Sequence, residues 1–408
     1  MPDTITDPLA LDHILDPDVL PNPYPFYRQL RESDPIHHDA VYGWVLTRHA
    51  DVVAALRDPR MSAERLMLAP DGLPPEWLDV LSPALRAFAR QMLFLDPPDH
   101  TRLRGLVNKA FTPRAVAQMR ERIQVMVDGI LDTLAQADEV DMMRDLAFPL
   151  PVAVIASMLG IPAEDHPQFT RWTADFGSLL NGSPLPPEGL LAALTGLTAL
   201  MDYFRQAIAD HRAHPHDDLL QGLISADDRG DVLDEEELLG NCMLLLAAGH
   251  GTTTDLIGNG LLALLRHPEQ LARLRDDPSM IESAVTEFLR YDGTVQMTSR
   301  LAREDLTIAG QTITAGENVM IVLGAANHDP AQFPDPDRLN LTRAENRHVA
   351  FGHGIHYCVG APLAQLETQI VFTALTRRFP TMRLASETLD WQQSIVFRGL
   401  TGLPMVLR

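Results

Sequence analysis

One of the two cysteines of the chain lies near its C-terminal end in a stretch rich in glycine. Cys358 follows Gly352 and Gly354 and precedes Gly360, and the pattern predicts a helix that begins near Ala361. A sulfur at a helix start faces free backbone N–H groups and the positive end of the helix dipole, which favour thiolate over thiol. The glycines let the backbone pass close under a flat object. Such a loop is suited to holding a thiolate as a metal ligand, although a lone cysteine is more often a small buried hydrophobe.

The spacing around this cysteine favours the first interpretation. The pattern Phe-Gly-x-Gly-x-His-x-Cys-x-Gly-x-x-Leu-Ala runs from Phe351 to Ala364 with every position filled, and it resembles the haem-binding loop of the cytochrome P450 family. The resemblance implies haem b as cofactor, Cys358 as the ligand of its iron, and Phe351, Gly352 and Gly360 beside the porphyrin. A thiolate ligand pushes electron density toward oxygen and favours O–O cleavage, a rule for which this family is itself the example.

Composition agrees with a soluble cytoplasmic enzyme. The chain has 408 residues, a net charge of −22 and only two cysteines, so we expect a reducing compartment and no disulfide framework. The N-terminus lacks the basic and apolar regions of a signal peptide. The longest apolar run, Cys242–Ala248, is far shorter than the ~20 residues that span a bilayer. The acidic balance argues against nucleic acid and membrane as partners.

The periodicity of the chain is mostly helical. Amphipathic or apolar runs predict helices at 114–136, 200–213, 235–266, 268–289 and 362–378, and short alternating pieces predict strands at 43–46, 306–308, 318–323 and 404–407. No linker divides the sequence. We therefore expect a mainly α fold with small β-sheets. The resemblance covers almost the whole chain and implies a single cytochrome P450 domain over 1–408 without a fused reductase, with haem between a long central helix and the cysteine loop.

The longest predicted helix follows Asp234, a good N-cap. Its middle carries glycines and threonines that weaken the helix and leave room for a ligand or water. The family's oxygen-binding helix carries Ala-Gly-x-acid-Thr-Thr, and here Gly251 occupies the acidic position. In the family, that acid and the adjacent threonine deliver protons during oxygen activation. The resemblance implies a catalytic segment made of Ala248, Gly249, His250, Gly251, Thr252 and Thr253.

The missing acid puts the usual proton route in doubt. His250, an ordered water beside Gly251 or a polar group of the substrate could replace it. We favour water, because neither Gly249 nor Gly251 has a side chain to fill the groove.

Two further sets of residues match family positions. His100 and Arg104 are four residues apart and share a predicted helix face; with Arg300 and His356 they resemble the residues that bind the haem propionates. Glu287 and Arg290 resemble the family's Glu-x-x-Arg motif, for which the resemblance implies Arg338 as third partner. We expect this second set to be a buried structural network, as a buried charge network must be complete to be tolerated.

The substrate pocket is less marked in the sequence. The family builds it from segments that correspond here to Arg60–Phe94, 168–200, Met243–Ala248, Thr294–Thr298 and Ile395–Phe397, with a lid at Gly177–Pro187. These segments are rich in Met, Leu and Val, and Asn241 and Gln296 are the expected polar orienters. The expected wall consists of Met61, Leu93, Phe94, Leu180, Asn241, Leu244, Val295, Gln296, Met297 and Val396.

Function and partners follow from the resemblance. We expect a monooxygenase that uses O2 to hydroxylate or epoxidise an apolar organic substrate, with electrons from a separate ferredoxin or flavodoxin. An acidic donor could dock on a basic patch of Arg102, Lys109, Arg114 and Arg347. A peroxide-using haem-thiolate enzyme remains an alternative because of Gly251. A catalytically silent haem protein that recruits or senses is the alternative outside the enzymes.

Overall fold

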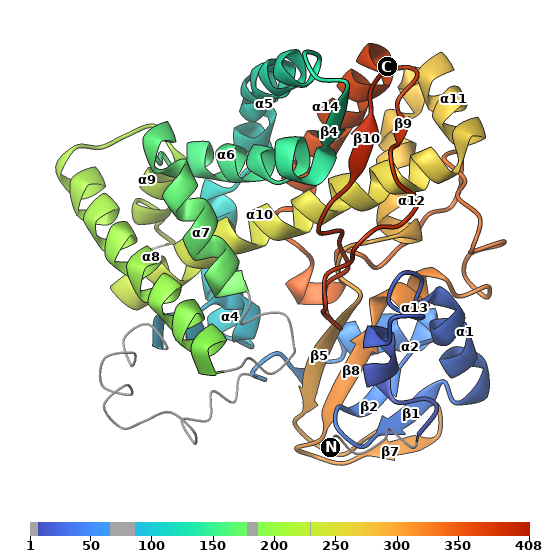
Figure 1. The fold of residues 1–408 in the computed structure, drawn as a ribbon. Helices are drawn as coiled ribbons and strands as arrows, with labels where there is room; N and C mark the ends of the chain where they lie inside the picture. The colour runs from blue at the N-terminus through green and yellow to red at the C-terminus, as the bar shows by residue number, and fades with distance from the viewer. Residues whose placement is uncertain (1–6, 66–85, 178–186, 229) are drawn as a thin grey trace.

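The computed structural model of the protein describes residues 7–65, 86–177, 187–228 and 230–408. In this part of the chain the fold is mainly helical, with small β-sheets (Figure 1). The predicted fold class is therefore confirmed. No helix of the described residues is long and apolar enough to cross a lipid bilayer.

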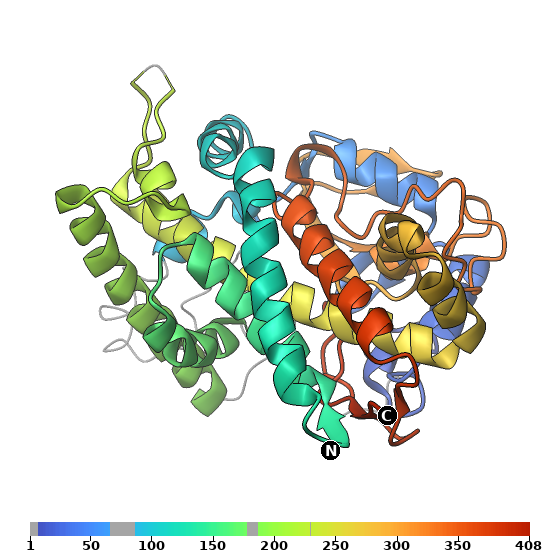
Figure 2. The ribbon, with the colours of Figure 1, turned by 90° about the horizontal axis from the view of Figure 1, so that it is seen from above.

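Helix α10, Glu235–Arg266, is 32 residues long and passes through the middle of the molecule (Figures 1 and 2). Its start is closed by a capping box. The Asp234 carboxylate accepts from the N–H of Glu237, and the Glu237 carboxylate accepts from the N–H of Asp234. Most of its side chains are buried whichever way they point, as expected of a central helix. The predicted helix at 235–266 is confirmed, and it extends over about 48 Å.

Helices from both halves of the chain pack on α10. They include α6, Pro149–Met158, and α7, His166–Gly177, together with α8, Pro187–Ala213, α12, Ile281–Tyr291, and α14, Ala361–Arg378. Helix α14 also packs along α5, Pro113–Leu134, and the two lie side by side in Figure 2. Because α14 begins just after Cys358, its contacts with α5 and α10 hold the cysteine loop in place. Among the described residues, further α-helices are α1, Tyr24–Ser33, α2, His49–Arg57, α4, Asp99–Ala110, α9, Leu219–Ile224, α11, Pro268–Asp276, and α13, Leu323–Asn327.

Two predicted helices differ from the observed ones. The run at 268–289 is interrupted after α11 at Asp276 and resumes in α12 at Ile281, because Pro278 has no N–H and cannot continue the first helix. The helix predicted at 200–213 is the second half of α8, which begins at Pro187. Its glycine-containing first half had not been assigned to a helix.

The largest sheet lies beside the helical part, together with α1, α2 and α13 (Figure 1). Its strand order is β1-β2-β8-β5-β3, and all neighbours are antiparallel except β2 and β8. The pairing of Ser62 with Leu301 places the chain after β3 beside Arg300. The strands are β1, Ile36–Asp39, β2, Gly43–Leu46, β3, Met61–Ser62, β5, Met297–Ala302, and β8, Asn318–Val322.

Two smaller sheets complete the fold. One joins β4, Glu139–Asp141, β10, Pro404–Val406, and β9, Arg383–Leu384, and the other joins β6, Leu306–Ile308, and β7, Gln311–Ile313. The predicted strands at 43–46 and 306–308 are confirmed, and those at 318–323 and 404–407 end one residue earlier than predicted.

The tight packing of α10 gives a stability prediction. A Cβ at Gly240 would overlap the backbone carbonyl of Ala87, so Gly240→Ala should lower the free energy of unfolding by about 1–3 kcal/mol. Gly129, also inside a helix, has no atom within 4 Å of a Cβ, and Gly129→Ala should instead raise it by up to about 1 kcal/mol. Urea unfolding of both variants is the measurement. Equal effects of the two substitutions would contradict the close contact at Gly240.

Candidate active site

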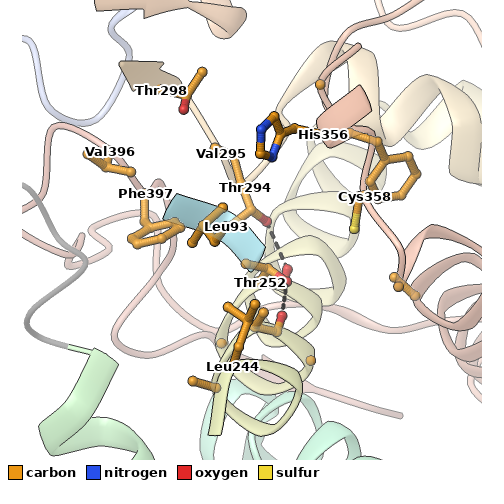
Figure 3. Close-up of a pocket in the computed structure, with 18 of the residues that line it drawn as sticks. Leu93, Leu244, Thr252, Thr294, Val295, Thr298, His356, Cys358, Val396 and Phe397 are labelled. Carbon is orange, nitrogen blue, oxygen red and sulfur yellow. Dashed lines mark hydrogen bonds between the residues drawn. The ribbon is translucent and has the colours of Figure 1, made fainter. Parts of the chain in front are cut away.

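Most residues with predicted roles line one cavity of about 780 Å³. Its wall is formed by α10, the Cys358 loop, α4, β5 and the C-terminal turn around Val396. Figure 3 shows the Cys358 sulfur and the Thr252 side chain facing this space from different elements. The fold therefore brings together two motifs that are far apart in the sequence.

The Cys358 thiol is held at the edge of the cavity. Its accessible surface opens into the cavity, since Cys358 is one of the lining residues. Burial raises the pKa of this thiol, while the backbone N–H groups of Gly360 and Ala361 and the Arg104 guanidinium lower it. The lowering effect predicted for the helix start is therefore present, and burial opposes it. A metal ion in the cavity would favour the thiolate further.

Cationic side chains cluster beside the thiol without anionic partners. Arg65, Arg104 and Arg300 all line the cavity, and in the described chain no carboxylate oxygen lies within ion-pair distance of any of them. Desolvation lowers the pKa of all three, to about 9 for Arg65 and to about 10 for Arg300. Neither ring nitrogen of His100 has a hydrogen-bond partner, and Nε2 of His356 has none. Buried cations and donors of this kind call for an anionic ligand.

Arg65 was not found by the sequence analysis. It follows β3 as an isolated arginine, and only the pairing of β3 with β5 brings it near Arg300. Its guanidinium lies 5.3 Å from the ring centroid of Phe94. Burial and the nearby cations His100 and Arg300 lower the pKa of His356 to about 3, so this imidazole is neutral and can donate only one ring N–H.

The middle of α10 forms a groove opposite the thiol. The Thr252 hydroxyl donates to the carbonyl of Ala248 at 2.7 Å, and the Thr294 hydroxyl donates to the carbonyl of Thr252 at 3.0 Å (Figure 3). A Cβ at Gly251 would have no atom within 4 Å, so the position of the family's acid is open space. Thr253 and Gly249 also line the cavity.

His250 is a neutral side chain in this groove. Its ring packs edge-on against Phe148, with the centroids 4.6 Å apart, and its Nε2 has no hydrogen-bond partner. Desolvation lowers the pKa of His250 to about 4. A neutral imidazole can accept a proton or pass one on, but it does not store one at neutral pH.

Two buried acids of the cavity wall were also missed. Asp255 lies on α10 one turn beyond Gly251, and Glu367 lies on α14. Oδ1 of Asp255 accepts from Nε2 of Gln392 at 2.8 Å, whereas Oε2 of Glu367 has no partner. Desolvation raises the pKa of both carboxyls well above the usual range. The i, i+4 spacing from Gly251 is the signal that could have revealed Asp255.

Some of the residues predicted to form the substrate wall line the cavity, and others do not. Leu93, Phe94, Leu244, Val295, Met297 and Val396 line the cavity. Met61 lies instead in the core of the large sheet. Asn241 bonds to the backbone of Glu237 and Met92 and does not line the cavity. Gln296 donates to the carbonyl of Gly293 and lines a small separate pocket. Leu180 and most of the lid expected at Gly177–Pro187 lie outside the described residues.

The expected network at Glu287 has a different third member. Glu287 is 0% exposed and accepts from Nε and Nη2 of Arg290 at 2.9 Å. The third cation is Arg343, whose Nε lies 3.1 Å from the carboxylate. The prediction of Arg338 is wrong. Its side chain is exposed, and only its carbonyl takes part, accepting from Arg290 and Arg343.

The basic patch is partly neutralised. Arg102 pairs with Glu237 and Asp231, and Lys109 pairs with Asp228. Arg114 and Arg347 are exposed. Carboxylates therefore offset the charge of two of the four expected members, and docking of an acidic donor on this patch stays a prediction.

Comparison with known proteins decides the family. The model of the family "Cytochrome P450" matches residues 81–390. The chain belongs to the cytochrome P450 family. Cytochrome P450 CYP107DY1 of Priestia megaterium is 41% identical, over 98% of this chain and 99% of the relative. The vitamin D(3) 25-hydroxylase of Pseudonocardia autotrophica is 42% identical, over 95% of this chain and 94% of the relative.

A solved structure agrees with this assignment. The crystal structure of P450BioI with an acyl carrier protein ligated to hexadec-9Z-enoic acid superposes with a TM-score of 0.89 at 37% identity, covering 96% of this chain and 99% of that one. This cytochrome P450 is a haem-iron monooxygenase. The thiol, the groove and the cations without anionic partners fit an iron porphyrin with two carboxylates.

The corrected network gives a matched pair of substitutions. Arg343→Ala leaves part of a buried carboxylate uncompensated and should cost on the order of 3 kcal/mol of unfolding free energy. Arg338→Ala removes an exposed side chain and should change it by less than about 0.5 kcal/mol. Chemical unfolding of the haem-loaded variants distinguishes the two. A larger loss with Arg338→Ala would restore the assignment from sequence.

Proposed function

We propose that this cytochrome P450 hydroxylates or epoxidises an apolar organic molecule of moderate to large size, such as a secondary-metabolite skeleton. Electrons come from a separate ferredoxin or flavodoxin, and the cofactor is haem b. The observation that carries the proposal is the pairing of the Cys358 thiol with the Thr252 groove across a mainly apolar cavity. Two similar proteins are named for apolar molecules, a vitamin D(3) hydroxylase and a complex with a hexadecenoic acid conjugate.

The residues of the cavity would have separate tasks. When bound, haem supplies reductive activation of O2 at an iron that the Cys358 thiolate holds. Arg65, Arg104, Arg300 and His100 would bind the propionates, with His356 as a neutral donor, because among the described residues no carboxylate is at ion-pair distance from the three arginines and Asp96 acts on Arg65, Arg300 and His100 only from further away. Phe351, Gly352 and Gly360 would pack beside the porphyrin.

The distal wall would orient the substrate and handle protons. Leu244, Val295 and Val396 would exclude water and direct an apolar molecule toward the groove. The Thr252 hydroxyl already donates to Ala248, so its oxygen is left to accept a proton-bearing water in the open space beside Gly251.

A peroxide-using enzyme is the second candidate, and Gly251 is the observation in its favour. Peroxide brings its own protons, so an enzyme that relies on it needs no acid at this position. The ratio of product formed with reductase and O2 to product formed with peroxide separates the two functions. A catalytically silent haem protein would form no product by either route.

We also infer one domain over residues 1–408 and a cytoplasmic location. Helix α10 contacts helices from both halves of the chain, which favours one unit. Both cysteines are free thiols, which fits a reducing compartment.

The absorption spectrum of the reduced protein with CO tests the function. The parent should show the red-shifted band of a thiolate ligand, and Cys358→Ser should lose both this band and product formation, because a serine oxygen donates less charge to iron. Cys242→Ala is the control, since Cys242 is equally free but does not line the cavity, and it should keep the band. A thiolate band that survives Cys358→Ser would overturn the assignment of the ligand.

A further inference from the structure

Helix α10 lacks a carboxylate at Gly251 but carries one a turn later. Residues three and four apart share a helix face, so Asp255 lies on the face that presents Gly251 and Thr252 to the cavity, and it lines the same cavity. Among the described residues, no atom lies within 4 Å of a Cβ position at Gly251. No described side chain therefore fills the groove at Gly251.

The surroundings of Asp255 keep its proton in place. The side chain is 4% exposed, and its one hydrogen bond comes from the neutral amide of Gln392. Gly399 packs against it so closely that a Cβ there would overlap the carboxyl. In the described chain no charged group contacts it, and desolvation raises its pKa well above the usual range. Burial without a cationic partner among the described residues therefore favours the uncharged form of the Asp255 carboxyl. Gln392 is partly exposed and itself lines the cavity.

We propose that Asp255 replaces the acid missing at Gly251 and relays protons into the groove beside Thr252. In each transfer, the carboxylic acid gives its proton to water in the groove and takes another from solvent near Gln392. Proton number balances, and no electron moves. This inference rests on the proposed function, since it concerns oxygen activation in the same cavity.

Asp255→Asn is the decisive variant, because it keeps the acceptor for Gln392 and the side-chain volume but removes the proton. General acids contribute about 10²–10⁴-fold to rates, so product formed per reduced nicotinamide consumed should fall at least about tenfold. Peroxide-driven turnover should be unchanged. Infrared spectra of the resting protein should contain a protonated carboxyl band that shifts in D2O and is absent from Asp255→Asn.

A rescue experiment separates a proton role from a structural one. Gly251→Glu in the Asp255→Asn background should restore most of the lost coupling, and Gly251→Gln should not, although both fit the open space. Unchanged coupling in Asp255→Asn, or no protonated carboxyl band in the parent, would overturn the relay. Absence of the thiolate CO band, or of product by either route in the parent, would instead refute the proposed function.

A second, independent group of side chains lies at the C-terminal end of α8, where the chain continues into α9. Asp210, His211 and His216 present ligand atoms that all lie within 4.8 Å of one another. Nε2 of His216 is 3.4 Å from Oδ2 of Asp210, and Nε2 of His211 is 2.9 Å from Oδ2 of Asp218. Ligands of a tetrahedral zinc site at about 2.1 Å from the ion lie about 3.4 Å apart. The separation of His216 from Asp210 is of that size, and the shorter separation of His211 from Asp218 is that of a hydrogen bond.

The hydrogen bonds of His211 point to a cation. Its Nδ1 lies 2.8 Å from the carbonyl of Ala207, which can only accept, so Nδ1 carries a hydrogen. In the neutral ring Nε2 then has a lone pair directed at the Asp218 carboxylate. Only a proton or a metal ion on Nε2 relieves this contact. A histidine that donates its other N–H to a backbone carbonyl is the usual arrangement in metal sites, and His211 is 5% exposed and fixed in this orientation.

We infer a site for a divalent metal ion of the zinc class, with Asp210, His211, His216 and Asp218 as ligands. Imidazole nitrogens with carboxylate oxygens suit such ions. Asp218 also caps α9, its Oδ1 accepting from the N–H of Gln221. A bound ion would therefore tie the end of α8 to the start of α9 and stabilise the native state.

Zinc binding to the haem-loaded enzyme tests this site, since iron then occupies Cys358. After chelator treatment, equilibrium dialysis should give one zinc per chain and a rise in the unfolding temperature. His216→Ala should weaken binding at least about tenfold. Removing a residue that only hydrogen-bonds to a metal ligand already costs about 10-fold to 100-fold in affinity, and loss of a ligand should cost no less. His38→Ala should leave binding intact, because His38 is exposed on β1 and lies outside the group, whereas His214 contacts Asp210. No zinc bound by the parent, or equal affinity in His216→Ala, would overturn the site and leave His211 and Asp218 as a hydrogen-bonded pair.

Discussion

The active site depends on one constraint: a desolvated thiol must face a helix groove across a space that admits a flat cofactor. Cys358 cannot move away because α14, which follows it, packs on both α5 and α10. Helix α10 cannot move because it is buried on nearly all sides. Burial opposes the ionisation of the free thiol, and a positive ion in the cavity would favour the thiolate. The fold therefore positions the ligand, and the metal completes it.

Charge within the cavity is opposite to the charge of the protein. The chain carries −22 overall, yet Arg65, Arg104 and Arg300 converge on the cavity without a carboxylate at ion-pair distance. Buried cations without a carboxylate at ion-pair distance destabilise the cofactor-free protein. A ligand with two carboxylates offsets that cost. Cofactor affinity and fold stability are thus linked through the same side chains. The Glu287 network is different because its anion and cations are all supplied by the chain itself.

The departures from the family pattern share one feature. The acid expected at position 251 is replaced by Gly251, and the side chain of Arg338 is exposed and does not contact Glu287. In each case a residue of the expected chemistry lies nearby. Arg343 contacts Glu287 from five residues further along the chain, and Asp255 lies one helical turn from Gly251. A chemical task can move along a helix or loop when the new position projects into the same volume. Position in a motif is therefore a weaker guide than the space a side chain reaches.

From an N-cap and helical periodicity, the sequence by itself predicted the mainly helical fold and the range of α10. The spaced cysteine motif carried the resemblance to the family, and only that resemblance implied the placement of Cys358 opposite Thr252. It could not identify Arg65, Arg343 or Asp255, nor exclude Met61 and Asn241 from the cavity. Only the tertiary structure decided these, because strand pairing and helix packing bring distant residues together. Burial is likewise a property of the packed chain, and it raises the pKa of Asp255 and opposes the ionisation of Cys358.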